Sequence, residues 1–89
     1  MNATYATTDG VLESKLGDET VLLDMESGQY FGLDPVGSFV WHGLKDGKAP
    51  AEIIARLSEE FTDVPDSARA DVVTFLRELA EKKLISPNA

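Results

Sequence analysis

The sequence predicts an α+β domain of the winged helix-turn-helix type, in which a three-stranded antiparallel sheet is followed by three helices. Apolar and polar residues alternate through residues 11–33, which is the period of strands. Apolar residues then recur at helical spacing through residues 35–83. The chain has 89 residues, enough for one domain with a modest core.

Three short segments carry the strand pattern, at residues 11–16, 20–25 and 29–33. Gly17-Asp18 and Ser27-Gly28 separate them at hairpin distance and tolerate a positive φ. The sequence therefore predicts an antiparallel meander of three strands.

The alternation also assigns side chains to the two faces of each strand. Leu12 and Leu16 fall on one side of the first strand, and Val21, Leu23 and Met25 fall on one side of the second. On the third strand, Phe31 and Leu33 share a side that Tyr30 does not.

Three helices are predicted after the strands. Asp34 followed by Pro35 is typical of an N-cap and first turn, and Gly47 ends this helix. A second helix opens near Pro50, with a weak cap because Ala49 has no side-chain oxygen. The third runs over about residues 66–83.

The ends of the chain lack periodicity and are polar. We expect residues 1–9 to form a mobile tail, residues 10–85 to form the domain and residues 86–89 to form a C-terminal tail.

Composition excludes several classes of function. A net charge of −8 disfavours binding to nucleic acid and to anionic membranes. The absence of cysteine excludes disulfides and thiolate metal sites, and fits a cytoplasmic protein. No secretory signal or membrane-spanning apolar run is present. His42 is the only histidine and has no companion for a metal site or a catalytic triad, so we expect neither an enzyme nor a cofactor.

The sequence TVLLDMESGQYFGLDPVG at residues 20–37, followed by Val40-Trp41, resembles the PqqD-like family of RiPP recognition elements. The similarity covers roughly residues 10–85 and looks most like the standalone leader-binding proteins of lasso-peptide biosynthesis. Ala49 in place of a Ser or Thr cap and a Phe at position 39 depart from the family pattern, outside the expected groove.

The resemblance implies a peptide-binding role. The leader of a ribosomally made precursor peptide would add as an extra strand to the third strand, in a groove that the third helix completes. A leader peptidase would be the partner enzyme, and an ATP-dependent cyclase a further partner. Alternatively, the domain would present a precursor peptide to a radical-SAM maturase.

Strand addition requires a free sheet edge, and the last strand of a meander has one. Gly32 within that strand is consistent with close approach of another backbone, or with a bend into the first helix. The apolar character of Phe31 and Leu33 favours the core over contact with a peptide. We expect Val72, Leu76 and Leu79 on the third helix to be mostly core. The candidate peptide-binding residues are Gln29, Tyr30, Phe31, Gly32, Leu33, Val72, Val73, Phe75, Leu76, Arg77 and Leu79.

The order of helices also permits a DNA-binding regulator. In that case the second helix of the turn would enter the major groove. That helix carries Glu52, Glu59 and Glu60 against Arg56, a net negative set, which disfavours this alternative.

Overall fold

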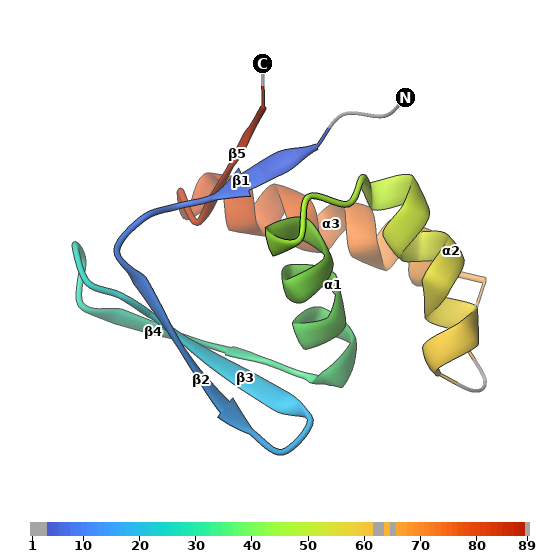
Figure 1. Cartoon of the computed structure of the whole chain (residues 1–89), viewed down its shortest axis with the longest axis horizontal. Helices are drawn as coiled ribbons and strands as arrows, with labels where there is room; N and C mark the ends of the chain where they lie inside the picture. The colour runs from blue at the N-terminus through green and yellow to red at the C-terminus, as the bar shows by residue number, and fades with distance from the viewer. Residues whose placement is uncertain (1–3, 62–63, 65, 89) are drawn as a thin grey trace.

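The fold is an antiparallel sheet of three strands followed by three helices, as predicted, with a short second sheet that joins the two ends of the chain (Figure 1). The computed structural model describes residues 4–61, 64 and 66–88. The elements are β1 (Tyr5–Thr7), β2 (Val11–Leu16), β3 (Glu19–Asp24), β4 (Gln29–Leu33), α1 (Pro35–Lys45), α2 (Pro50–Glu60), α3 (Ala68–Glu81) and β5 (Ile85–Pro87).

The main sheet has the order β2-β3-β4, with both pairs antiparallel. β2 and β4 match the predicted strands, and β3 begins and ends one residue earlier than predicted. The pairing of β3 with β4 is continuous, with Val21 opposite Gly32, so Gly32 does not form a bulge.

The sequence signals at the helix starts act as predicted. The Asp34 side chain accepts a 2.7 Å hydrogen bond from the N–H of Gly37, and Pro35 occupies the first turn of α1. Ala49 gives α2 no side-chain cap. α1 ends at Lys45, before Gly47, and α3 is shorter than predicted at both ends.

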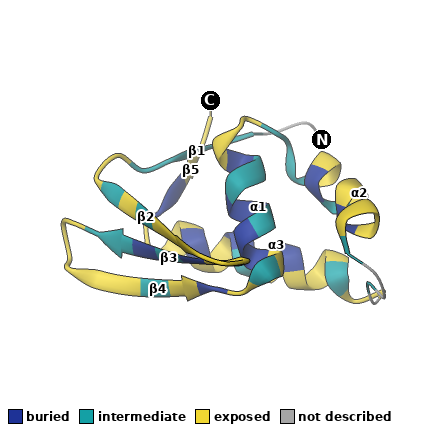
Figure 2. Cartoon of the chain, turned by 60° about the horizontal axis from the view of Figure 1, so that its bottom comes forward, coloured by how far each residue is buried: buried dark blue, intermediate teal, exposed yellow. Residues whose placement is uncertain are grey.

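Helix α1 is the centre of the core. Val40, Trp41 and Leu44 are each 1% exposed, and α1 contacts α2, α3, β1, β3 and β4. Figure 2 shows this helix as the most buried element, with the exposed stretches of β2 and β4 at the edges of the sheet.

Residues 4–9 and 86–88 correct the prediction of two tails, and residues 1–3 and 89 of those tails lie outside the described residues. Tyr5–Thr7 pairs with Ile85–Pro87 as an antiparallel ribbon, and the Asn88 N–H donates to the Thr4 carbonyl at 3.0 Å. Ile85 is 3% exposed and belongs to the core. Strands of three residues are too short to show a period, and their partners lie about 80 residues away in the sequence.

Candidate functional site

An open groove lies between β4 and α3. Its volume is about 720 Å³, which is within the range of small-ligand pockets. Among the described residues, no Cα atom of α3 comes within 8 Å of a Cα atom of β4. Side chains from both elements line the space instead, chiefly Phe31 and Leu33 from β4 and Val72, Phe75 and Leu79 from α3.

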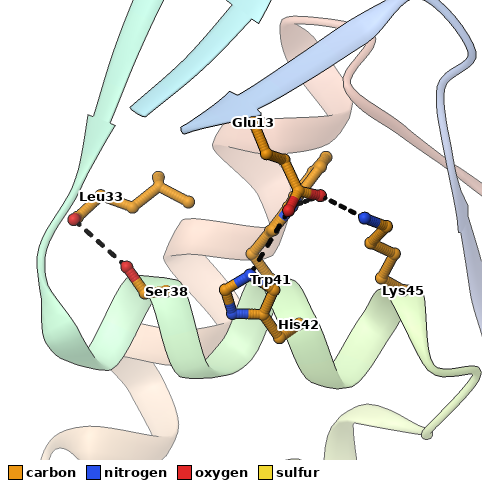
Figure 3. Close-up of polar contacts among 6 residues, drawn as sticks. All are labelled: Glu13, Leu33, Ser38, Trp41, His42 and Lys45. Atoms are coloured by element: carbon orange, nitrogen blue, oxygen red, sulfur yellow. Dashed lines mark hydrogen bonds and ion pairs between the residues drawn. The ribbon is translucent and has the colours of Figure 1, made fainter. Parts of the chain in front are cut away.

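The start of α1 holds the two walls of the groove in place. One residue, Asp34, separates β4 from α1, and the Ser38 hydroxyl donates to the Leu33 carbonyl at 3.3 Å (Figure 3). Gly37 is buried, and a Cβ atom there would lie 3.5 Å from the Phe75 ring. Phe75 therefore packs directly beside the first turn of α1, at the distance of ordinary van der Waals contact from position 37.

One side of β4 has no strand partner in the described part of the chain, because β4 pairs with β3 alone. An unpaired edge of this kind exposes backbone N–H and C=O groups, and can pair with a further strand. The groove opens along this edge, so an extended segment lying there could bond to β4 and contact α3 together.

The floor of the groove is apolar and its rim on α3 is charged. Asp71, Glu78 and Lys82 line the rim. The Lys82 Nζ atom lies 5.7 Å from the centre of the Phe31 ring, at the distance of a cation–π contact. This contact places a positive charge beside the otherwise acidic rim.

The structure brings six of the predicted site residues together and leaves five outside. The groove is lined by Phe31, Gly32, Leu33, Val72, Phe75 and Leu79. Gln29 and Tyr30 lie on β4 without lining it, and Tyr30 is 71% exposed on the opposite face of the sheet. On α3, Val73, Leu76 and Arg77 lie outside the lining, and Leu76 is core.

Other elements contribute lining residues that the sequence does not predict. Val36 comes from α1, Phe61 and Val64 follow α2, and Lys82 follows α3. The edge-on packing of Phe61 against Phe39, with ring centroids 5.8 Å apart, fixes the end of α2 beside α1. A contact of this kind between distant segments leaves no periodic signal in the sequence.

A polar cluster in the C-terminal half of α1 attaches β2 to this helix (Figure 3). Glu13 of β2 accepts hydrogen bonds from Trp41 Nε1 and Lys45 Nζ, both at 2.7 Å, and lies 3.4 Å from His42 Nε2. Partial burial by itself raises the pKa of Glu13. The hydrogen bonds from Lys45 and Trp41, with the nearby positive charges, outweigh burial and hold the pKa below its usual 4.5.

The described residues contain no cluster of three or more His, Cys, Asp or Glu side chains that could hold a metal ion. In the same part of the chain, no helix combines the length and the apolarity needed to cross a membrane.

Residues 19–85 match the family model described as PqqD, coenzyme PQQ synthesis protein D. A solved structure of TbiB1 in complex with the TbiA(beta) leader peptide superposes with a TM-score of 0.81 and 39% identity, covering 94% of this chain and 98% of that one. Another, of a lasso peptide synthetase B1 complexed with the leader peptide, has a TM-score of 0.81, 25% identity and coverage of 96% and 100%. No curated protein matches the chain.

Proposed function

The chain belongs to the PqqD family, and we propose that it binds the leader segment of a precursor peptide by strand addition to β4 and delivers it to processing enzymes. The observation that carries this proposal is the groove of about 720 Å³ that opens beside the unpaired edge of β4. Two similar structures, at 39% and 25% identity, are complexes with leader peptides.

The chemistry of the groove suits an extended peptide. Backbone bonds along β4 would supply affinity that depends little on sequence, and apolar pockets would select alternate side chains of the leader. β4 has five residues, so it can pair with about five leader residues, or roughly 17 Å of strand. Phe31, Leu33 and Phe75 would contact the leader side chains that point toward α3.

The role is that of an adaptor, without a catalytic step of its own. A leader peptidase would receive the leader from this domain, and an ATP-dependent cyclase would act on the rest of the precursor. The similarity to lasso peptide synthetase B1 favours this pathway over delivery to a radical-SAM maturase.

A DNA-binding role has less support. The exposed side of α2 carries Glu52, Glu59 and Glu60, and Arg56 is paired with Glu52 at 3.1 Å. The helix that would enter the major groove therefore has no free positive charge for phosphate.

Fluorescence anisotropy tests the proposal. Labelled TbiA(beta) leader and the labelled leaders of precursors encoded in the same gene cluster would be titrated with the purified chain, beside scrambled leaders and duplex DNA. Saturable binding to a true leader alone supports the adaptor role. Binding to duplex DNA, or equal binding to true and scrambled leaders, contradicts it.

A further inference from the structure

Two aromatic side chains of the groove between β4 and α3 lie in different electrostatic surroundings. Phe31 comes from β4 and Phe75 from α3, and both line the groove. Each is only partly buried, so part of each ring is open to a bound peptide. The charged residues of the rim are divided unevenly between the two rings.

Phe75 lies between two carboxylates. Asp71 precedes it by four residues and Glu78 follows it by three, so all three side chains share one side of α3. Asp71 and Glu78 are exposed on the rim of the groove, and neither forms an ion pair with another described residue. A Lys or Arg side chain of a peptide could therefore lay its apolar stem on the Phe75 ring and place its charged end beside either carboxylate.

Phe31 has a positive charge beside it instead. Lys82 Nζ lies 5.7 Å from the centre of the Phe31 ring, and Lys82 is the only cation that lines the groove in the described part of the chain. Glu78 stands four residues before Lys82, in the favourable order for an ion pair, yet Lys82 is directed toward Phe31 and no such pair forms. A basic peptide side chain above Phe31 would be repelled there, and a carboxylate would be attracted.

The two rings follow one another along β4. Phe31 faces Lys82, at the end of α3, and Leu33 lies near Phe75, because a Cβ atom at position 37 would be 3.5 Å from both Leu33 Cβ and the Phe75 ring. β4 and α3 therefore run in opposite directions across the groove. Every second side chain of an added strand would point toward α3. The two leader residues that meet Phe75 and Phe31 would thus be two positions apart.

We propose that the two rings are leader subsites of opposite charge preference. Phe75, between Asp71 and Glu78, takes a basic leader side chain. Phe31, beside Lys82, takes an acidic one. A shift of the leader by two residues would place one of these charges beside a like charge, so the pair of subsites fixes the register of the bound leader. The inference rests on the proposed function, because it takes the ligand of the groove to be a leader strand added to β4.

A charge scan of the leader tests the inference. In the synthetic, labelled leader of the precursor from the same gene cluster, each residue is replaced in turn by Lys, by Glu and by Gln, and each peptide is titrated with the purified chain by fluorescence anisotropy. Two positions, two residues apart, should show opposite preferences of at least about threefold, for Lys over Glu at one and for Glu over Lys at the other. Added salt should reduce both preferences.

Variants of the chain then assign each position to a ring. Asp71→Asn/Glu78→Gln should abolish the preference for Lys and keep the preference for Glu, whereas Lys82→Glu should reverse the preference for Glu. All three side chains are exposed, so the fold should tolerate these changes. Glu81→Gln and Arg77→Glu are the matched controls, because both residues are exposed on α3 outside the lining of the groove. They should leave both preferences unchanged.

Two outcomes overturn the inference alone. The first is binding of the unsubstituted leader without a charge preference at any position. The second is a pair of preferences that the groove variants leave unchanged, or that the two controls alter equally, since the charged contacts would then lie away from Phe31 and Phe75. Failure of the unsubstituted leader to bind would instead overturn the proposed function, and the inference with it.

Discussion

The indole N–H of Trp41 donates a 2.7 Å hydrogen bond to Oε1 of Glu13, and this bond connects the largest buried side chain of α1 to β2. Lys45 donates to the same carboxylate, one helical turn further along α1. The Glu13 carboxylate is tolerated on the inner face of the sheet because Trp41 and Lys45 donate hydrogen bonds to it there. Since successive side chains on a strand point to opposite faces, Leu12 and Leu16 lie on the outer face.

Glu13→Gln should lower the free energy of unfolding by about 1 kcal/mol at neutral pH, since the charge-assisted bond to Lys45 is lost while an acceptor for Trp41 remains. The folded-state pKa of Glu13 lies below 4.5, so its stabilisation is present above that pH and is lost as the pH falls through the folded pKa. Urea unfolding over a pH series should show the wild type and Glu13→Gln converging in acid.

Glu52→Gln is the control for this change. Glu52 pairs with Arg56 at 3.1 Å on the exposed side of α2, where an ion pair contributes little. A difference that stays constant as the pH falls would contradict the role given to Glu13.

Gly43→Ala should destabilise the packing of α1 on α2. A Cβ atom at position 43 would lie 2.8 Å from Cγ1 and 2.9 Å from Cδ1 of Ile53, a buried β-branched side chain with few alternative rotamers. Overpacking of this kind costs about 1–3 kcal/mol and outweighs the gain of about 1 kcal/mol for Ala over Gly in a helix. In thermal unfolding, Gly43→Ala should have a lower Tm than wild type. Gly32→Ala, with nothing within 4 Å of the added atom, should not.

Thr20→Val should stabilise the chain by about 1 kcal/mol. Thr20 is fully buried, and its Oγ1 atom has no hydrogen-bond partner among the described residues. Valine keeps the shape and removes the unsatisfied hydroxyl. Thr20→Ser, which keeps the hydroxyl and loses the methyl group, should be less stable than wild type in urea unfolding. A loss of stability in Thr20→Val would indicate that the hydroxyl has a partner.

Local signals explain how much of the fold could be predicted. Asp34 and Pro35 start a helix through contacts within four residues, and the alternation along residues 11–33 is a property of each strand alone. The β1–β5 ribbon could not be predicted in this way, because its stability depends on the burial of Ile85 by distant segments.

The candidate groove could likewise be predicted only in part, as far as local sequence signals reach. The sequence predicts the apolar stripe of α3. It does not distinguish which edge of the stripe, at Phe75 or at Val73, faces the sheet. The packing of Phe75 beside Gly37 decides which edge faces β4. Alternation likewise separates the two faces of β2, yet only the position of Trp41 shows which face is inside.

Lys83→Gly should stabilise the end of α3. Lys83 has a φ of 61°, which is the left-handed region that favours glycine. Its N–H donates to the Ala80 carbonyl and that of Leu84 donates to the Leu79 carbonyl, which is the pattern of a Schellman motif. Relief of the strain should raise the free energy of unfolding by about 0.5–1 kcal/mol. Lys83→Ala, which removes the same charge without relieving the strain, should show no gain.

Phe75→Glu should weaken leader binding at least about tenfold, or 1.4 kcal/mol, because it places a charge on the apolar wall of the groove. Val73→Glu is the matched control, since Val73 lies two residues away on the same helix, is 46% exposed and does not line the groove. Anisotropy titrations with a labelled leader would measure both, with circular dichroism to verify that each variant is folded. Equal affinities for two folded variants would place the peptide outside the groove between β4 and α3, and a loss confined to Phe75→Glu would locate it against α3.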